Sequence, residues 1–452
     1  MDIKPIELMT YPKEGEITPE IVSKFIKIHQ DEVKRYKYLS DMYRGIMDIA
    51  SQKAKEDWKP DNRLSVNFPK YIVDTFTGYF NGIPVKKTHK KEAILEKLQE
   101  FDNLNDMEDE ESELSKMACI YGRAFELLYQ DEDTQTNVIY NSPENMFMVY
   151  DDSIRQEPLF AVRYGVDKDN KLFGELYTQT QKYILSGKKD GINMTEDAKD
   201  SPFDSLPVVE FYFNEERMSI FESVISLVNA FNKAISEKAN DVEYFSDQYI
   251  AFLGAQIDEE NVKNIRDNRV INFFGRPGDD SRVDVKFLDK PDSDTQTENL
   301  LNRLVKLIFQ TTMVADISDE SFGTTSGVAL AYKLQAMSNL ALSFQRKFQS
   351  ALNKRYKLFC SLSTNVSDSE AWKDIEYTFT RNEPKDIKEQ ADTANILMGI
   401  TSQETALSVL SVVPDIPAEM EKIKKEESET TIFDQDKRLD KQETIIHENK
   451  EE

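Results

Sequence analysis

Glycine, proline, cysteine and histidine are all scarce in this chain of 452 residues. It has 15 glycines and 15 prolines, whereas charged residues make up 31% of the sequence. Because both residues interrupt helices and supply the turns between short strands, their scarcity favours a helix-rich chain over a sandwich of many short strands. The 39% hydrophobic and 10% aromatic residues exclude general disorder. We expect an α+β protein in which helices predominate, built from several packed regions because one core becomes inefficient at this length.

The two cysteines, Cys119 and Cys360, lie far apart and lack the spacing of metal ligands. This spacing argues against a disulfide scaffold, suits a reducing compartment and predicts that both cysteines are buried as small apolar residues. The start of the sequence has no apolar signal region, and no stretch approaches the length that spans a bilayer. The sequence therefore predicts a protein made and kept in the cytoplasm, without a membrane partner.

Motifs of catalysis are also lacking. The chain has no glycine-rich phosphate loop, dinucleotide-binding motif, zinc-protease motif or nucleophile elbow. Its three histidines, His29, His89 and His447, are too few and too scattered for a catalytic triad. With 83 acidic residues, some pair of carboxylates will match any chosen spacing, so such pairs are almost no evidence for acid–base catalysis or for a two-metal site. We expect no enzyme, no cofactor and no metal site.

Basic residues are outnumbered, 57 against 83, which gives a formal net charge of −26. Such a charge repels phosphate backbones at long range and makes a sequence-specific DNA reader improbable. A pore is a different case, because acidic walls keep DNA from sticking while it slides. The charge therefore excludes tight DNA binding and leaves passage of DNA open.

Helical and strand patterns divide the first half of the chain. Thr18, Pro19 and Glu20 supply an N-cap, a first-turn proline and a first-turn acid, and predict a helix to about Ala50. Residues 62–87 read as a helix, a stop at Asn81-Gly82 and a turn. Residues 125–186 consist of short β-rich runs separated by polar turns and predict an antiparallel sheet.

Three long helical patterns dominate the second half, over residues 215–248, 295–314 and 326–362. The first two carry apolar stripes, formed by Phe231, Ile235 and Val242 around Lys238, and by Leu301, Leu304, Val305 and Ile308. A small α/β module is expected between these two, and a polar loop between the second and third. Residues 376–425 hold a strand-like run and a smaller helical unit, and the charged end predicts a frayed tail.

Two basic clusters remain open to alternative interpretations. Lys86, Lys87, Lys90 and Lys91 favour a solvated loop over a phosphate contact. Five basic residues interleave with the apolar stripe of the third helix: Arg346, Lys347, Lys354, Arg355 and Lys357. They favour a solvent-exposed polar face of this helix, and a contact with another subunit is the more specific alternative. Periodicity alone cannot separate an ordinary core from an oligomer seam.

Six segments in the same order make this chain resemble the portal proteins of long-tailed phages that infect Gram-positive bacteria. The strongest is NRLSVNFPKYIVDTFTGYFNGIPV from Asn62, with an asparagine-flanked start, a helix with valine-aspartate, and a glycine-x-proline exit. The others are YGRAFELLYQDED, NSPENMFMVYDD, the run that begins with LPVVEFYFNEERMSIFESV, TSGVALAYKL and GITSQETALSVLSVVPD. The match of each segment alone to this family is weak, but six matches in the same order are specific for it.

The resemblance implies a ring-forming architecture and a name for each region. It assigns residues 1–228 to an N-terminal wing, 229–248 and 292–314 to the stem, and 249–291 to the clip. Residues 315–325 would be the tunnel loop, 326–375 the long wing helix, 376–425 the crown and 426–452 a flexible acidic tail. The stripe residues listed above, with Lys238, would belong to the stem. The clip would include Phe273, Phe274, Arg276 and Arg282.

The resemblance also implies a function and its partners. The chain would form a ring, typically of twelve copies, at one capsid vertex, and double-stranded DNA would pass through it without sequence specificity. The terminase large subunit, the head-completion adaptor, the major capsid protein and the scaffolding protein would be its partners in a virion assembled in the host cytoplasm. The tunnel loop would present Asp319, Glu320, Ser321, Phe322, Gly323, Thr324, Thr325 and Gly327 to the DNA. Because it carries acids and no base, contact through hydroxyls and backbone amides is expected there, without a strong phosphate grip.

Two rival interpretations remain. A helical scaffold or adaptor without a DNA channel would use the same stripes as coiled-coil seams, and would form extended dimers or trimers. A metal-dependent nuclease would use some of the many carboxylates, and would cleave plasmid DNA when a divalent metal is present.

Overall fold

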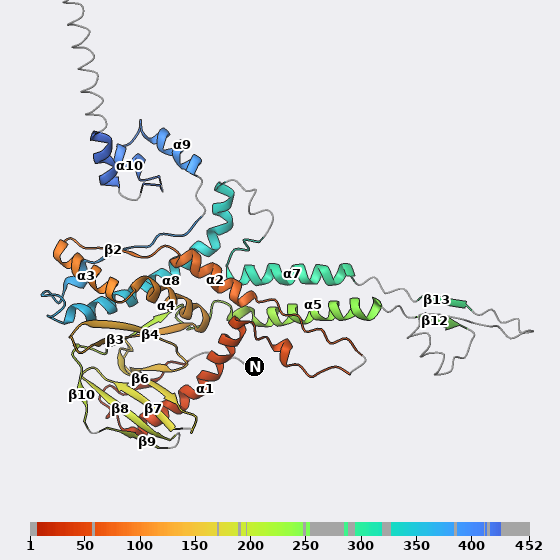
Figure 1. Cartoon of the computed structure of the whole chain (residues 1–452), viewed down its shortest axis with the longest axis horizontal. Coiled ribbons are helices and arrows are strands. Elements are labelled where there is room, and N and C mark those ends of the chain that lie inside the picture. Colours follow the sequence, from red (N-terminus) through yellow and green to blue (C-terminus); the bar gives the residue numbers. More distant parts are fainter. Residues whose placement is uncertain are drawn as a thin grey trace, which may run out of the picture. The chain divides into compact units, whose positions relative to one another are not determined.

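The computed structural model describes most of the chain as helices and antiparallel strands (Figure 1). The described residues are 7–56, 59–169, 171–188, 191–195, 197–246, 250–253, 284–287, 294–318, 327–383, 387–410, 412–413 and 416–425. Helix and sheet both contribute, so the predicted α+β class is confirmed.

The first long helix, α1 (Pro19–Arg44), begins where the sequence predicts. The Thr18 side chain accepts a hydrogen bond from the backbone N–H of Ile21, and proline occupies the first turn. The helix ends earlier than the predicted Ala50, because Gly45 takes the left-handed conformation with φ of 87°. The short 3-10 helix η1 (Asp48–Ser51) follows.

Three further helices surround the start of the sheet region. Helix α2 (Phe68–Asn81) is capped by Asn67, whose side chain accepts from the Lys70 N–H, as the predicted helix and stop require. Helices α3 (Glu92–Leu104) and α4 (Met107–Tyr121) follow, and α4 ends at Gly122, which is left-handed with φ of 90°.

Strands from residues 123–212, together with the short strand β1 near the start of the chain, build two sheets, and the predicted antiparallel region is confirmed. A three-stranded sheet has the order β11-β3-β4, and a seven-stranded sheet has the order β1-β5-β6-β7-β8-β10 with β9 on β8. All of these pairings are antiparallel except β1 with β5. The strands are β1 (Thr10–Tyr11), β3 (Arg123–Gln130), β4 (Thr136–Asn141), β5 (Met146–Asp151), β6 (Pro158–Val166), β7 (Lys171–Tyr177), β8 (Gln181–Lys188), β9 (Gly191–Met194), β10 (Lys199–Asp200) and β11 (Val208–Tyr212).

Apolar side chains of α1 cover one face of the larger sheet. Val22, Phe25 and Ile26 pack in one core with sheet residues such as Phe160 and Leu176. The hydrophobic side chains of α1 recur at helical spacing, so a single stripe of the helix is buried. This packing fixes α1 against the larger sheet.

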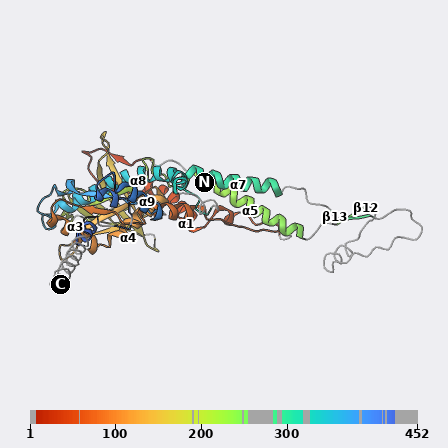
Figure 2. The same ribbon diagram turned by 90° about the horizontal axis from the view of Figure 1, so that it is seen from above.

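A helical hairpin projects from this body (Figure 2). After the 3-10 helix η2 (Glu222–Val224), α5 (Ile225–Ser246) runs outward and α7 (Asp294–Thr312) returns. Between them, β12 (Ile250–Leu253) and β13 (Asp284–Phe287) pair in antiparallel fashion.

The longest helix, α8 (Gly327–Ser361), inserts an aromatic stripe into the body. Phe344 and Phe348 both contact the ring of Phe80 in α2. Phe344 also contacts Phe213, which follows β11, and Phe348 contacts Phe211 within β11. After η3 (Ala371–Asp374), strand β14 (Glu376–Thr378) pairs with β2 (Lys86–Thr88). Helices α9 (Ile387–Leu397) and α10 (Gln403–Leu407) follow, and residues 416–425 are also helical.

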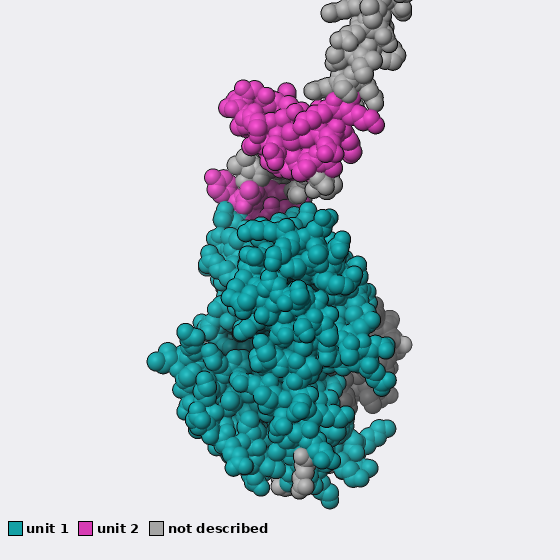
Figure 3. Space-filling view, turned by 90° about the vertical axis from the view of Figure 1, so that its left-hand side faces the viewer, with its two compact units in different colours: residues 1–316, 335–382 teal, residues 317–334, 383–452 magenta. Residues whose placement is uncertain are grey.

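The chain divides into two compact units (Figure 3). One consists of residues 1–316 with 335–382 and contains the sheets and the α5–α7 hairpin. The other consists of residues 317–334 with 383–452 and contains α9 and α10. None of the helices in the described part of the chain is long and apolar enough to cross a membrane.

Candidate functional site

The α5–α7 hairpin brings the predicted stem residues together. Phe231, Leu301, Leu304 and Ile308 are buried, as their helical spacing predicts. Ile235 and Val305 are half-buried, and Val242 near the end of α5 is exposed. The Lys238 ammonium, which interrupts the apolar stripe of α5, forms an ion pair with Glu298 of α7. The stripes therefore join the two helices within one chain.

An extended segment, residues 61–67, lies along α5 and is bonded to it at regular intervals. The backbone N–H groups of Asn62, Leu64 and Val66 donate to the side-chain oxygens of Asn240, Ser236 and Asn232, at 2.6, 2.9 and 2.8 Å. We call this segment the splint.

The regularity of the splint has a geometric cause. Two residues of extended chain advance about 6.6 Å, and four residues of helix advance about 6 Å. Every second N–H of the splint therefore meets every fourth side chain of α5. The splint runs antiparallel to α5, since Asn62 meets Asn240 and Val66 meets Asn232. The Ser236 hydroxyl also donates to the Leu64 carbonyl, so two hydrogen bonds join Leu64 and Ser236 at the centre of the splint.

Further contacts hold both ends of the splint. Asn62 Nδ2 donates to Glu243 at 2.6 Å, and Lys55 pairs with Glu237 at 2.7 Å. At the other end, the ring of Phe68 contacts Phe231 and Phe309 edge-on. The hairpin is thus braced by a segment that precedes α5 by more than 150 residues in sequence.

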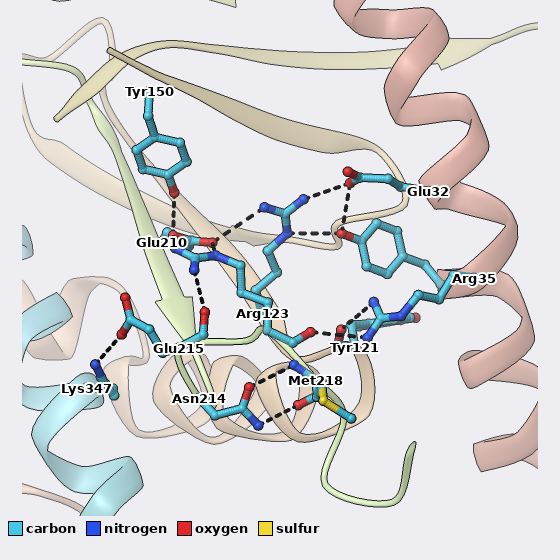
Figure 4. A network of polar contacts seen from close by, with 12 residues as sticks. Glu32, Arg35, Tyr121, Arg123, Tyr150, Glu210, Asn214, Glu215, Met218 and Lys347 are labelled. Atoms are coloured by element: carbon cyan, nitrogen blue, oxygen red, sulfur yellow. Dashed lines mark hydrogen bonds and ion pairs between the residues drawn. The ribbon is translucent and has the colours of Figure 1, made fainter. Parts of the chain in front are cut away.

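A buried ionic network holds the root of the hairpin, where residues 213–224 lead from β11 into α5 (Figure 4). Arg217 donates from Nε and Nη2 to the two oxygens of Glu210, at 2.9 and 3.0 Å. Arg35 of α1 donates to Glu222, at 2.7 Å from Nε, and to the Arg217 carbonyl. Arg123 pairs with Glu32 at 3.0 Å. The root is therefore connected to α1 and β11 by charge-assisted bonds, and Arg123 of β3 forms ion pairs with Glu32 of α1 and Glu210 of β11.

The ionisation of Glu210 follows from its neighbours. Burial raises the pKa of its carboxyl, but the charges of Arg217 and Arg123 outweigh this effect, so that the net pKa is lowered. Tyr150 also donates a hydrogen bond to Glu210, and burial next to this carboxylate raises the pKa of the phenol. Glu210 is therefore ionised and Tyr150 neutral at neutral pH.

The backbone at the root leaves no room for a side chain at Gly122. A Cβ built there would lie 1.9 Å from the carbonyl oxygen of Arg217. The Gly122 carbonyl accepts from the Phe213 N–H, and the preceding carbonyl of Cys119 accepts from Ile220 N–H and the Ser219 hydroxyl. Glycine at this position permits the close approach of the two chain segments.

A second buried ionic cluster lies where α8 meets α4 and β3. Arg355 is fully buried and donates to Glu126 and Glu111 at distances of 2.6 to 3.0 Å. Lys87 pairs with Glu111 and Asp102. Burial, and then the charge of Glu126, raise the pKa of the nearby Glu110 to about 8.

This cluster corrects two interpretations of the basic residues. Arg355 does not belong to an exposed polar face, because the carboxylates of Glu111 and Glu126 compensate its charge in the interior. Lys87 does not lie in a solvated loop, because it occupies strand β2 and its side chain is only 8% exposed. Lys347 does lie on the surface, where it pairs with Glu215.

Sequence patterns missed the ionic network, although a signal for it was present. Arg123 and Glu126 interrupt an otherwise apolar strand, and all residues of β3 up to Leu128 are buried. Arg355 follows Phe348 by seven residues and therefore shares its buried face. Both cysteines are buried without a disulfide, as predicted.

Several predicted site residues lie outside the described residues. These are the clip residues Phe273, Phe274, Arg276 and Arg282 and the tunnel-loop residues Asp319, Glu320, Ser321, Phe322, Gly323, Thr324 and Thr325. Gly327 is the first residue of α8. Within the described ranges, no group of three or more histidine, cysteine, aspartate or glutamate side chains is placed to hold a metal ion.

Comparison with known proteins assigns the chain to a family. Residues 22–432 match the family model described as phage portal protein, SPP1 Gp6-like. The chain belongs to this phage portal family. Its function is accordingly that of a portal protein, and the predicted family and function are confirmed. Members of this portal family are structural proteins of the virion.

Two curated portal proteins illustrate the similarity. The portal protein of Bacillus phage SPP1 is 27% identical over 411 residues, which cover 85% of this chain and 80% of that protein. The portal protein of Clostridium phage phiCD119 is 25% identical over 397 residues, which cover 81% of this chain and 85% of that protein. A solved structure is described as the neck of an empty GTA particle. Its alignment covers 80% of this chain and 96% of the chain in that structure, with 12% sequence identity and a TM-score of 0.47. The family assignment depends on the sequence matches.

Proposed function

We propose that copies of this portal protein form a ring at one capsid vertex, typically of twelve subunits, and that the α5–α7 hairpins are the walls of its channel. Double-stranded DNA passes through without sequence specificity, driven by the terminase ATPase, and leaves by the same route at ejection. The chain itself catalyses no reaction. The ring belongs to the virion and is assembled in the host cytoplasm.

The braced hairpin is the observation that carries this proposal. A channel wall must keep its shape while DNA moves past it, and α5 is held by α7, by the splint and by the ionic network at its root. Such a wall also must not bind phosphate tightly. The net charge of −26 carried by the chain disfavours tight binding of a phosphate backbone.

The remaining regions take the roles that the family resemblance implies. Residues 249–291 form the clip, which meets the terminase large subunit and later the head-completion adaptor. Residues 315–325 form the tunnel loop, and residues 376–425 form the crown inside the capsid. Residues 1–228 and 326–375 form the wing, which faces the major capsid protein and the scaffolding protein.

The hairpin also bears on the rival scaffold interpretation. A coiled-coil adaptor needs free apolar stripes for its partner. Leu301, Leu304 and Ile308 are instead buried within one chain. This favours a hairpin wall over an intermolecular seam.

Electron microscopy of the purified full-length protein tests the proposal. Annular particles with a central hole are expected. Extended dimers or trimers without a hole would favour the scaffold interpretation. Plasmid cleavage that requires a divalent metal would favour the nuclease interpretation.

A further inference from the structure

Strand β4 forms one edge of the three-stranded sheet, whose order is β11-β3-β4. In an antiparallel edge strand, the backbone groups of alternate residues bond to the neighbouring strand or point outward. Val138 donates its N–H outward, to the side chain of Asn105. The backbone groups of Thr136 and Tyr140, two positions away on either side, therefore also point outward. Such a row of outward groups is a template on which another strand can pair.

The side chain of Asn105 occupies this edge in the manner of a strand residue. Its Oδ1 accepts from the Val138 N–H at 2.8 Å, and its Nδ2 donates to the Thr136 carbonyl at 3.3 Å. In a pair of parallel strands, one residue likewise accepts from an N–H and donates to the carbonyl two positions earlier. The carboxamide of asparagine offers the same kind of donor and acceptor as a peptide group. Asn105 thus takes the place of one residue of an additional strand.

Asn105 is itself held in place by the end of α3. Its backbone N–H and its Nδ2 both donate to the Phe101 carbonyl, at 3.2 and 2.9 Å. Phe101 is buried, and its ring centroid lies 4.4 Å from that of Phe359 in α8. A second asparagine, Asn365, exchanges hydrogen bonds with the Thr136 hydroxyl. Two asparagines from distant parts of the chain therefore cover the first half of β4.

Apolar side chains next to this edge remain exposed. Ile139 of β4 and Tyr129 of β3 are each 44% exposed, and Tyr140 is 38% exposed. Ile139 lies opposite Leu127, so Ile139 and Tyr129 are diagonal neighbours on one face of the sheet. An edge strand flanked by exposed β-branched and aromatic side chains favours pairing with another chain. A second copy of the protein offers an identical edge with the same side chains.

We propose that Asn105 is a strand mimic that closes the outward edge of β4 and prevents this edge from pairing with β4 of a second copy. The inference goes beyond the proposed ring, because it identifies a surface that stays closed whether or not the subunit has assembled. Pairing through the opened edge leads to a β-aggregate, which is a different product from a closed ring.

The test removes the side chain of Asn105 in the full-length protein. Asn105→Ala takes away both hydrogen bonds to β4, and Asn103→Ala makes the same change at an exposed position of α3. Two further variants add a charge to Asn105→Ala: Ile139→Lys on the edge strand, and Leu342→Lys at an exposed position of α8 as its control. Hydrogen exchange of residues 136–141 measures opening of the edge, with residues 335–361 of α8 as the reference for folding. Thioflavin fluorescence and light scattering at increasing concentration measure β-aggregation.

In Asn105→Ala, residues 136–141 should exchange faster by on the order of tenfold, while α8 keeps its protection. Aggregates that bind thioflavin should form at a concentration lower by a similar factor. Asn103→Ala should match the wild type, Ile139→Lys should suppress the aggregates, and Leu342→Lys should not.

Unchanged exchange of residues 136–141, or faster exchange without aggregation, would overturn the inference. Equal suppression by the two lysines would also overturn it, since the aggregates would then not form through β4. Should Asn105→Ala lose the protection of α8 as well, the milder Asn105→Asp is judged by the same criteria, because its carboxylate still accepts from the Val138 N–H.

Discussion

The side-chain oxygen of Asn232 in α5 accepts a hydrogen bond from the backbone N–H of Val66 at 2.8 Å, across 166 positions of sequence. With the equivalent bonds at Ser236 and Asn240, it makes the splint part of the hairpin. The shape of the proposed channel wall therefore depends on a segment that has no regular secondary structure of its own.

Replacing Ser236 with alanine should weaken the splint. The variant removes the acceptor of the part-buried Leu64 N–H, and a typical hydrogen bond contributes about 0.5 to 1.5 kcal/mol net. The free energy of unfolding should fall by that amount, and the Leu64 amide should exchange faster. Ser226→Ala, at an exposed position of the same helix, should change neither quantity. Unaltered exchange at Leu64 would mean that the bond does not hold the segment.

Replacing Gly122 with alanine should be strongly destabilising. Its φ of 90° disfavours any side chain, and a Cβ would lie 1.9 Å from the Arg217 carbonyl oxygen. Gly78 offers a matched control, because it lies inside α2 and a Cβ there would have no atom within 4 Å. Gly78→Ala should be neutral or stabilising by about 0.5 to 1 kcal/mol. Thermal unfolding of both variants decides, and equal stabilities would contradict the close packing at the root.

Replacing Arg217 with methionine should leave Glu210 buried without its main partner. Breaking a buried ion pair from one side costs about 3 to 5 kcal/mol. Combining the change with Glu210→Gln should recover part of this loss, because the uncompensated charge is removed. Arg303→Met, at an exposed position of α7, is the control. If the double variant is no more stable than Arg217→Met in denaturant unfolding, the charge of Glu210 is not the cause.

Glu110 should make stability depend on pH. Burial and the charge of Glu126 raise its pKa to about 8 in the folded protein, from an ordinary value of 4.5. Between these two values the unfolded chain releases the proton and the folded chain keeps it, so stability should fall as pH rises. Glu110→Gln removes this dependence.

The Glu110→Gln variant should therefore gain stability relative to wild type between pH 5 and 8 and keep a constant advantage above about pH 8. Glu108→Gln, at an exposed position of the same helix, controls for loss of a negative charge. Denaturant unfolding at a series of pH values measures the difference. A difference that does not vary with pH would show that Glu110 ionises in the folded protein as it does in the unfolded chain.

Gly323 of the proposed tunnel loop and Gly327, which the structure places at the first position of α8, should matter for packaging and not for assembly. Gly323→Val with Gly327→Val restricts the backbone that would reposition as DNA grooves pass. Rings should form normally, while packaged DNA per head should fall sharply. Normal genome filling by this variant would refute the role of the loop.

The helices of the hairpin were predictable because their apolar residues recur at helical spacing, but α5 begins at Ile225 and not at the predicted residue 215. The burial of Leu301, Leu304 and Ile308 could be predicted from the apolar pattern of their own segment alone, and all three are buried. The early end of α1 was also readable in principle, since Gly45 favours a left-handed C-cap.

The splint and the ionic clusters were not predictable in the same way. Arg355 finds Glu126 and Glu111 at separations of 229 and 244 residues, and a single sequence does not indicate which distant charges will meet. The hydrogen bonds of the splint likewise join backbone groups to side chains more than 160 positions away in the sequence. Local pattern determines helices and strands, whereas these contacts depend on the completed fold.

Imaging of assembled heads tests the central claim most directly. Particles produced with the capsid and scaffolding proteins should show, by cryo-electron microscopy, a ring of this chain at a single vertex, with the α5–α7 hairpins surrounding a central channel. Density for this polypeptide anywhere other than around the opening through which the genome passes, or a ring whose hairpins point away from the channel, would contradict the account.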